Sequence, residues 1–336
     1  MEPEEYYLQD LNKQNNQFFI ARTANEWIAE AERRPNPRKL FGEFWNEGEL
    51  CFLFASTNVG KSILAVQIAN AISSGEYADV FAVDCPPQKV LYFDFELSMK
   101  QFQNRYSDNY QQPYKFSSNF LRVEMNPDKV LTLPFETALM LALEQQVQHH
   151  NARVVIIDNI TYLKSQSLEV AKETMPLMNS LLTLKRKYGL SMLVLAHTPK
   201  RDQSRPIEIN DMAGSMMLGN LADSSFAIGK STLGPNLRYI KQIKVRDSAK
   251  LYGTENVIVC ELEKRDSFLQ FRNIGYESEF LHLKDPNTKP LSELDRNIIE
   301  LHRGNPEMSF REIARQLGTN HRRVSRVLER EEPQED

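Results

Sequence analysis

The chain has 336 residues, of which 26% are charged, and a formal net charge of −4. This length is enough for one large domain and a small one, and the composition is that of an ordinary globular protein. The net charge excludes a chain that is basic throughout. It leaves room for a local basic patch that could bind nucleic acid.

Three features of the sequence bear on where the protein works. Its apolar runs are far shorter than the ~20 residues that a membrane-spanning helix needs. The N-terminal stretch MEPEEYYLQD is acidic and lacks the pattern of a signal peptide. The three cysteines lie far apart and match no metal or redox spacing. We therefore expect a reduced, cytoplasmic protein that does not act at a membrane.

Residues 1–38 are expected to form an N-terminal arm that carries one short helix. Thr23 and Glu26 match a capping box, which predicts a helix at about 24–34. Its apolar side chains would dock either on the protein's own core or on a neighbouring subunit. These side chains belong to Trp27, Ile28 and Ala31.

The middle of the chain alternates short apolar runs with helix-like segments. This alternation predicts a mostly parallel sheet with helices on both faces. Later segments alternate like antiparallel strands, and we expect them to extend one edge of the sheet. The apolar runs are 50–55, 89–95, 120–125, 153–158, 191–197 and 224–229, the helix-like segments are 61–74, about 98–110, 135–150 and 173–188, and the later strands are 237–246, 255–263 and 268–275.

Residues 55–62, ASTNVGKS, match the end of a phosphate-binding loop and lie between a predicted strand and a predicted helix. Lys61 would reach the β- and γ-phosphates of ATP, and Ser62 would hold Mg²⁺. Ala55 replaces the usual first glycine, and Asn58 is a residue that tolerates a left-handed backbone. A chance match on a surface turn is the alternative, which the flanking elements disfavour. The expected nucleotide contacts are Ala55, Ser56, Thr57, Asn58, Val59, Gly60, Lys61, Ser62 and Ile63.

Two further predicted strands end in acidic residues. Asp158 ends the run RVVIID and is suited to hold the metal ion. Glu96 follows the strand after the phosphate-loop helix, at the sheet edge where ligands of open α/β sheets bind. A carboxylate at that position can deprotonate the attacking water. Asp94, two residues earlier, is the second candidate for this role.

This ordered set of motifs resembles the RecA-like hexameric ATPases, and most of all the replicative helicases of the RepA and DnaB kind. The resemblance covers about residues 39–265. It implies an ATP- and Mg²⁺-dependent homohexamer with Glu96 as the catalytic glutamate and Arg105 near the nucleotide base. It also implies that His197 senses the γ-phosphate, although a histidine at a strand end can be purely structural.

The resemblance also assigns roles to two segments after His197. The polar loop 198–213 corresponds to the loop that lines the central channel and binds single-stranded DNA through its phosphates. Lys244 and Arg246 correspond to a pair that reaches into the neighbouring subunit's site, and their spacing places both on one strand face. A solvated loop and a solvated strand face are the alternatives. The basic side chains of the loop are Lys200, Arg201 and Arg205.

The end of the chain predicts a small all-α domain. Residues 284–290 are expected to be a linker, and 291–331 to form a helix-turn-helix unit whose second short helix begins with a capping box, Ser309 and Glu312. Basic side chains on the last helix would face the major groove of duplex DNA. A protein-docking module is the alternative. The basic side chains are His321, Arg322, Arg323 and Arg326.

The sequence thus predicts an α/β, RecA-like ATPase domain over 39–283 and a DNA-binding domain after it. The first functional hypothesis is a ring-forming helicase that translocates on single-stranded DNA. It would act in the replication of a plasmid or another mobile element. The second is a RecA-like ATPase that binds duplex DNA as a non-unwinding regulator or recombination accessory protein, since fold does not fix function. A small-molecule kinase is a weaker third reading, because no pattern of a substrate lid or acceptor site is present.

Overall fold

The structure is a computed structural model of the chain. It describes residues 19–76, 81–126, 128, 133–160, 170–213, 215–246, 249–285 and 293–328, so most of the expected linker and the first half of the expected arm lie outside the described residues. The chain divides into two compact units, which are treated separately below. The first unit comprises Met1–Arg201 and Ile207–His282, and the second comprises Asp202–Pro206 and Leu283–Asp336.

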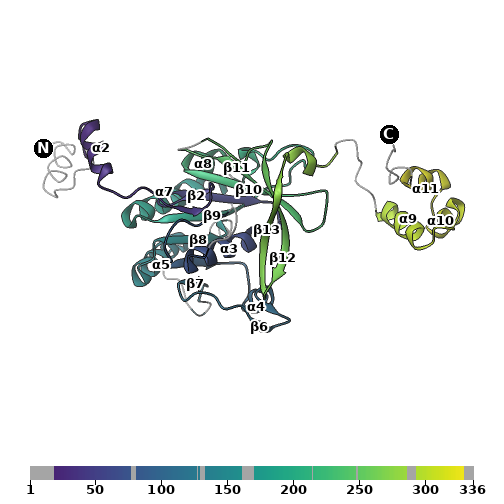
Figure 1. The fold of residues 1–336 in the computed structure, drawn as a ribbon, viewed down its shortest axis with the longest axis horizontal. Helices are drawn as coiled ribbons and strands as arrows, with labels where there is room; N and C mark the ends of the chain where they lie inside the picture. Colours follow the sequence, from purple (N-terminus) through teal and green to yellow (C-terminus); the bar gives the residue numbers. More distant parts are fainter. Residues whose placement is uncertain are drawn as a thin grey trace. The chain divides into compact units, whose positions relative to one another are not determined.

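A nine-stranded sheet forms the centre of the first unit, with the strand order β13-β12-β11-β10-β3-β9-β8-β4-β7 (Figure 1). Neighbouring strands from β10 to β7 are parallel, and β11, β12 and β13 add to one edge as antiparallel strands. This sheet confirms the predicted α/β fold class. The strands are β3 (Leu50–Ala55), β4 (Val90–Asp94), β7 (Phe120–Val123), β8 (Val154–Asp158), β9 (Ser191–His197), β10 (Ser224–Lys230), β11 (Leu237–Lys244), β12 (Val257–Arg265) and β13 (Phe268–Glu277).

Helices cover both faces of this sheet because the central strands are apolar on both sides. In β3, Cys51 and Leu53 belong to the core under α3, whereas Leu50 and Phe52 belong to the core on the opposite face. Helices α5, α7 and α8 contribute to that second core. Their bounds are α3 (Lys61–Ser74), α5 (Phe135–His150), α7 (Val170–Tyr188) and α8 (Ser215–Leu221).

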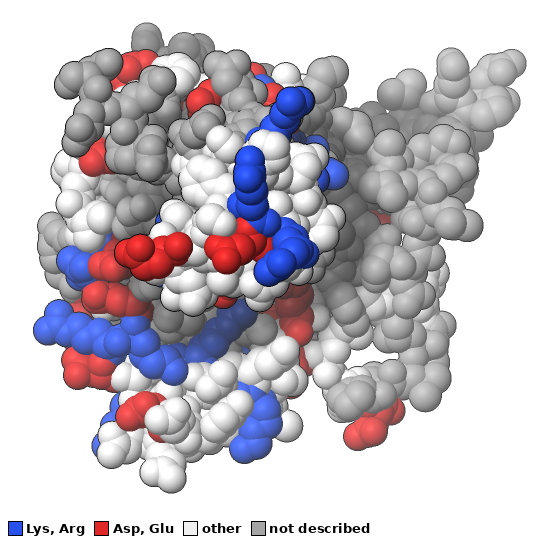
Figure 2. All heavy atoms as spheres, turned by 90° about the vertical axis from the view of Figure 1, so that its right-hand side faces the viewer, with Lys and Arg blue, Asp and Glu red and all other residues white. Residues whose placement is uncertain are grey.

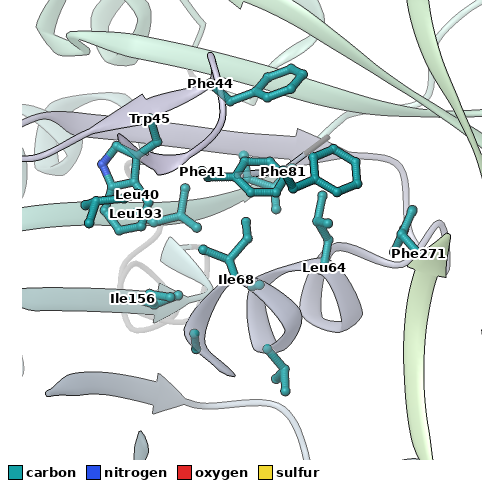
Figure 3. Packing of buried hydrophobic residues seen from close by; sticks show 14 of the residues in the cluster. Leu40, Phe41, Phe44, Trp45, Leu64, Ile68, Phe81, Ile156, Leu193 and Phe271 are labelled. Carbon is teal, nitrogen blue, oxygen red and sulfur yellow. The ribbon is translucent and has the colours of Figure 1, made fainter. Parts of the chain in front are cut away.

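An aromatic cluster beside α3 was not predicted. Two short strands, β1 (Lys39–Phe41) and β2 (Trp45–Asn46), form a small hairpin before β3. The ring of Phe41 stacks on that of Phe81 with centroids 4.7 Å apart, and both lie in one buried cluster with Leu64 of α3 (Figure 3). This packing fixes the helix that follows the phosphate loop against the sheet.

Two helices differ from their predictions. Helix α4 (Met99–Arg105) ends before 110, and a hairpin of β5 (Ser107–Asp108) and β6 (Gln111–Pro113) follows it. Helix α2 (Ala24–Glu32) begins with the predicted capping box at Thr23 but buries none of its residues. Docking of this helix on the protein's own core is therefore not observed.

The second unit contains a three-helix bundle. Its helices are α9 (Glu293–Gly304), α10 (Phe310–Gln316) and α11 (His321–Leu328), and α10 begins with the predicted capping box at Ser309. Ile298, Ile313 and Val324 contribute one side chain from each helix to a shared buried cluster.

Short 3₁₀ turns lie in the first unit at η1 (Ile209–Asp211) and η2 (Glu279–His282).

One face of the described surface is of mixed charge. On the face drawn in Figure 2, lysine and arginine side chains lie among aspartate and glutamate side chains. Such interspersed charge is typical of a well-solvated surface. Among the described residues, none of the helices has the length and apolar character needed to cross a membrane.

Candidate nucleotide site

Four parallel strands end side by side and bring the predicted site residues to one edge of the sheet. Ala55 at the end of β3 pairs with His197 at the end of β9, and Asp94 at the end of β4 pairs with Asp158 at the end of β8. The carboxyl ends of parallel strands meet at one edge, so a ligand there can contact all four. We refer to this edge as the carboxyl edge of the sheet.

The phosphate loop joins β3 to α3 through two residues with left-handed backbone. Asn58 has φ of 60° and Gly60 has φ of 116°, which agrees with the expected tolerance of asparagine. A Cβ atom on Gly60 would lie 2.8 Å from the ring of Phe271. Only glycine therefore fits at this position without moving β13.

Two of the antiparallel edge strands, β11 and β13, contact the phosphate loop and the helix after it. The Arg238 guanidinium of β11 donates from Nε to the carbonyl of Val59 at 3.0 Å. The side chain of Gln67 donates to the carbonyl of Phe271 at 3.0 Å and accepts from its N–H at 2.8 Å. These contacts link the loop and the first turns of α3 to β11 and β13.

Lys61 is 7% exposed and its ammonium group reaches three acceptors. Nζ lies 3.0 Å from the carbonyl oxygen of Ala55, 3.2 Å from that of Ser56 and 3.2 Å from Nδ1 of His197. Burial lowers the pKa of Lys61, and the negative charges of Asp158 and Glu96 oppose that shift. The lysine is thus held at the position from which a phosphate-loop lysine binds phosphate.

Asp158 is fully buried, and its environment fits a divalent cation. Oδ2 accepts a hydrogen bond of 2.6 Å from the Tyr92 hydroxyl, whereas Oδ1 has no partner in the part of the chain that the structure describes. Burial raises the pKa of Asp158 to about 6, against hydrogen bonds from Ser62 and Tyr92. A carboxylate oxygen and a hydroxyl are ligands that Mg²⁺ prefers. Ser62 and Asp158 would hold this ion.

No group of three or more histidine, cysteine, aspartate and glutamate side chains suited to a metal occurs among the described residues. A cation at Asp158 would therefore take its remaining ligands from water and phosphate. Mg²⁺ commonly binds in this way, through one or two protein oxygens and substrate phosphates.

Glu96 is half-exposed and faces the same space as Lys61. Its Oε1 accepts a hydrogen bond from the amide of Asn159 and lies 3.4 Å from Nε2 of His197. The hydrogen bond with His197 lowers the pKa of Glu96, with further help from Lys61 and Asn159, although burial works in the opposite direction. Glu96 therefore stays ionised, as a base must.

Asp94, the second candidate for the base, uses both of its carboxylate oxygens for contacts within the chain. It is 3% exposed, and its Oδ1 accepts the N–H groups of Glu96 at 3.1 Å and Leu97 at 2.9 Å. Its Oδ2 pairs with Nε of Arg122 at 2.9 Å. These contacts orient the turn that carries Glu96, which leaves Glu96 as the better-placed base.

One cavity of about 220 Å³ brings most of the predicted nucleotide residues together. Arg105 lies in its wall, and its buried NH1 atom has no hydrogen-bond partner among the described residues. Leu262 of β12 also lines it, which the sequence did not suggest. Ala55, Ser56 and Val59 lie outside this lining. The lining residues are Thr57, Asn58, Gly60, Lys61, Ser62, Ile63, Glu96, Arg105, His197 and Leu262.

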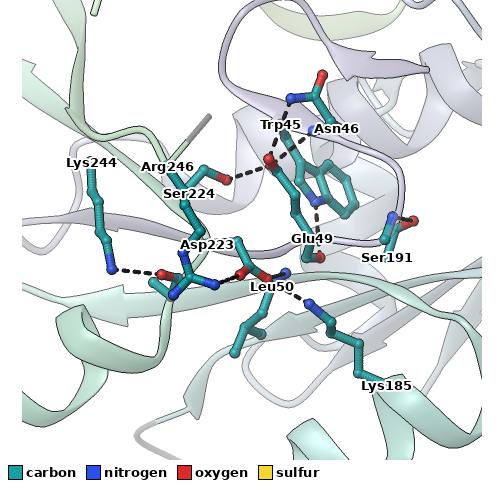
Figure 4. Close-up of polar contacts among 12 residues, drawn as sticks. Trp45, Asn46, Glu49, Leu50, Lys185, Ser191, Asp223, Ser224, Lys244 and Arg246 are labelled. Atoms are coloured by element: carbon teal, nitrogen blue, oxygen red, sulfur yellow. Dashed lines mark hydrogen bonds and ion pairs between the residues drawn. The ribbon is translucent and has the colours of Figure 1, made fainter. Parts of the chain in front are cut away.

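The predicted pair Lys244 and Arg246 lies near Asp223 and the start of β3 (Figure 4). Arg246 pairs with Oδ1 of Asp223 at 2.6 Å, and Oδ2 of Asp223 accepts the N–H of Leu50 at 2.9 Å. Leu50 begins β3, whereas the phosphate loop follows its end. Six residues of strand separate the two by about 17–20 Å. We refer to this opposite side as the amino edge of the sheet.

Lys244 is held at the amino edge by α8. Its ammonium group donates to the carbonyls of Gly219 at 2.8 Å and Ala222 at 2.7 Å, near the end of that helix. Cations are favourable at helix C-termini, where carbonyls lack partners within the helix. The chain therefore does not bring either member of the pair to its own nucleotide cavity.

The DNA-binding residues predicted in loop 198–213 separate into two groups. The side chain of Arg201 is only 9% exposed, and its Nε lies 3.3 Å from Oδ2 of Asp211. This ion pair joins residues near the two ends of the loop. Arg201 is thus the least accessible of the three basic side chains of this loop that are predicted to contact DNA. Lys200 and Arg205 are exposed.

The basic residues of α11 also separate. His321 and Arg322 are exposed. Arg323 instead donates from Nε to Oδ1 of Asp295 at 2.9 Å, which ties α11 to α9. Its role at the major groove stays a prediction, with the side chain 38% exposed beside this ion pair. Arg326 lies on α11, but its side chain lies outside the described residues.

Sequence reasoning missed several residues that shape the site. Asn159 could have been noticed as a polar residue directly after the buried strand that ends in Asp158. Tyr92 and Arg122 lie within strands, and nothing in their local pattern indicates that they contact Asp158 and Asp94. Their roles depend on contacts between distant parts of the chain.

Comparisons with known proteins found one family model and similar solved structures. A sequence model of the AAA domain family matches residues 20–203, which include the phosphate loop, Glu96, Asp158 and His197. Among curated proteins, none matches the chain significantly. A similar solved structure is that of a KaiC-like protein from the hyperthermophilic archaeon Pyrococcus horikoshii. It shares 13% identity, covers 68% of this chain and 91% of its own, and has a TM-score of 0.46.

Proposed function

Because the chain belongs to the AAA domain family of ATPases, we propose that it is a ring-forming motor that uses ATP hydrolysis to move on DNA. The observation that carries this proposal is the convergence of Lys61, Glu96 and His197 on one cavity, beside Ser62 and Asp158. This set supplies a phosphate-binding cation, a base and a metal site in one place.

Each residue has a distinct task in the proposed hydrolysis. Lys61 binds the β- and γ-phosphates, and Glu96 removes a proton from the attacking water. His197 lies between them and links the γ-phosphate to loop 198–213, which begins at the next residue. When bound, Mg²⁺ supplies positive charge that neutralises the phosphates.

The positions of Lys244 and Arg246 favour a ring. Both lie at the amino edge, about 17–20 Å along β3 from the cavity of their own chain. They could act on a nucleotide only if another copy of the chain presents its carboxyl edge to them. A closed ring of identical subunits, such as a hexamer, repeats that contact at every interface.

The DNA substrate is proposed from exposed basic side chains. Lys200 and Arg205 would bind the phosphates of single-stranded DNA, and His321 and Arg322 would contact duplex DNA. A motor with both contacts suits a RepA-like replicative helicase of a plasmid or mobile element. The second DNA contact would recruit it to a particular site.

One observation favours a second candidate function. The three-helix bundle of the second unit exposes His321 and Arg322 at the start of α11, where a recognition helix contacts bases. A protein that uses only this contact would bind duplex DNA and hydrolyse ATP without unwinding. It would act as a regulator or as an accessory protein in recombination.

The deciding experiment measures the ATPase rate against added single-stranded or duplex DNA. Lys61→Ala and Arg246→Ala are tested alone and mixed, and Arg265→Ala, an exposed arginine of β12, is the control. The helicase proposal expects strong stimulation by single strands and two inactive variants. Loss of an arginine supplied in trans costs roughly 10³–10⁵-fold in rate.

The mixture distinguishes a shared site from two separate defects. Mixed rings contain interfaces that combine an intact Lys61 with an intact Arg246, so part of the rate should return. A rate that ignores single strands, together with no displacement of a strand from a forked duplex, would contradict the helicase. Stimulation by duplex alone would support the non-unwinding regulator.

A further inference from the structure

Asn159 lies next to the proposed base but has no role in the site described so far. It follows Asp158 directly and is 1% exposed. Its Nδ2 donates a hydrogen bond to Oε1 of Glu96 and lies 3.0 Å from Nε2 of His197. A buried amide that contacts both the base and the histidine beside it occupies a position from which it can orient the base.

The three side chains have one consistent set of hydrogen bonds. A lysine ammonium can only donate, so the contact of 3.2 Å between Lys61 Nζ and His197 Nδ1 makes Nδ1 the acceptor. A neutral imidazole then carries its hydrogen on Nε2. The Nε2–H and the Asn159 amide then both donate to Oε1 of Glu96, and the 3.0 Å approach of their two nitrogens is not itself a hydrogen bond.

Asn159 and His197 both donate to Oε1 of Glu96, and Asn159 makes the closer contact. Nε2 of His197 lies 3.4 Å from Oε1, which is long for an N–H···O hydrogen bond, whereas the Asn159 amide is closer. A neutral amide also adds no charge beside Asp158, whose Oδ1 is needed for the cation. An aspartate at the same position would repel Glu96.

The contacts of Glu96 are unequal between its two oxygens. Oε1 receives both donors, whereas Oε2 receives none from the described residues. The backbone N–H of Glu96 is fixed separately by Asp94. The carboxylate is therefore held at its backbone and at one oxygen, and its other oxygen is available to a ligand.

We propose that Asn159 is a positioning residue that fixes the rotation of the Glu96 carboxylate so that Oε2 meets the attacking water. This inference rests on the proposed hydrolysis of ATP at the same cavity. Asn159 itself touches neither water nor nucleotide in this role. It acts on the reaction through Glu96, because small errors in the placement of a base cost large factors in rate.

The test compares Asn159→Ala and Asn159→Leu with the wild-type chain. Both remove the amide donor, and leucine keeps most of the volume if alanine destabilises the fold. The control is Asn119→Ala, which removes an amide that donates to the carbonyl of Ser73 away from the cavity. The measurements are kcat, KM, the affinity for ADP, the affinity for ADP with aluminium fluoride, and the melting temperature.

If Asn159 positions Glu96, its loss should weaken binding of the transition state and leave binding of the ground state nearly unchanged. kcat should fall by roughly 10–100-fold, and the affinity for ADP with aluminium fluoride, a transition-state mimic, should fall by a similar factor. KM and the affinity for ADP should stay within about twofold, because Lys61 and the loop bind the ground state. A purely structural role would lower stability and ADP affinity together and leave the ratio of the two affinities unchanged.

The double variant Glu96→Gln/Asn159→Ala separates this inference from the proposed function. If Asn159 acts through Glu96, the double variant is no slower than Glu96→Gln alone. An inactive Glu96→Gln combined with wild-type kcat in Asn159→Ala would overturn the inference alone. A fully active Glu96→Gln would overturn the proposed base and the positioning role with it.

Discussion

The two edges of the central sheet each contain an aspartate with little solvent exposure, and the two aspartates differ in how many of their oxygens have partners within the chain. At the carboxyl edge, Asp158 is buried with one oxygen unpartnered among the described residues. At the amino edge, Asp223 binds Arg246 through one oxygen and accepts from Leu50 and Lys185 through the other. Asp158 thus has an oxygen available to a ligand, whereas both oxygens of Asp223 are engaged within the chain.

The electrostatics of the two aspartates differ in the same way. Burial raises the pKa of Asp158 to about 6, and the negative charges of Glu96 and Asp94 add to that shift. Burial also works against ionisation of Asp223, yet the N–H of Leu50 and the ion pairs with Lys185 and Arg246 hold its pKa below the usual value. The amino edge is stabilised within the chain, whereas the carboxyl edge would be stabilised by its ligand.

The largest expected effect is the loss of catalysis on changing Glu96 at the carboxyl edge. Glu96→Gln should lower kcat by roughly 10²–10⁴-fold, because glutamine keeps the shape but cannot accept the proton. ADP affinity should change little. Glu124→Gln, a nearby exposed carboxylate, is the control. Comparable loss in the control would mean that charge, rather than a base, is what this edge supplies.

A smaller effect, on stability rather than catalysis, is expected at the amino edge. Asp223→Asn should lower the free energy of unfolding by about 2–3 kcal/mol, somewhat less than for a fully buried ion pair, because it leaves Lys185 without its carboxylate. Denaturant unfolding measures this change, and ADP titration should show unaltered binding. Glu144→Gln removes an exposed ion pair with Lys187 and should have no measurable effect. Weakened ADP binding in Asp223→Asn would show that the two edges are coupled.

The smallest effect has the opposite sign. Asp158→Asn should raise the free energy of unfolding by about 1–2 kcal/mol at pH 7.5 without metal or nucleotide, since it removes a buried charge. Thermal unfolding in a chelator measures this gain, and ATP hydrolysis should be lost. The same substitution would then be stabilising at the carboxyl edge and destabilising at the amino edge. Lower stability in Asp158→Asn would indicate that its ionised form already has a partner within the fold.

The sequence predicted those parts of the fold and site that depend on neighbouring residues. The strands, the helix 61–74, and the placement of Lys61, Glu96 and His197 at one sheet edge follow from local patterns, because parallel strands end together. The capping boxes at Thr23 and Ser309 are local as well.

What the sequence did not predict are contacts between residues that lie apart in the chain. Arg201 was assigned to DNA, but it pairs with Asp211, and Arg323 pairs with Asp295 across two helices. The role of Asn159 depends on Glu96, 63 residues earlier. An ion pair within the chain and a contact with DNA require the same side chain, so composition alone does not distinguish them.

The phosphate loop depends on strands that lie beyond the segment by which the family is recognised. That segment ends at residue 203, yet Arg238 holds the carbonyl of Val59, and the ring of Phe271 lies where a side chain on Gly60 would be. A fragment that ended at residue 203 would contain the phosphate loop, Glu96 and Asp158. It would still lack Arg238 and Phe271, which contact that loop. The residues that shape the phosphate loop therefore lie on both sides of position 203.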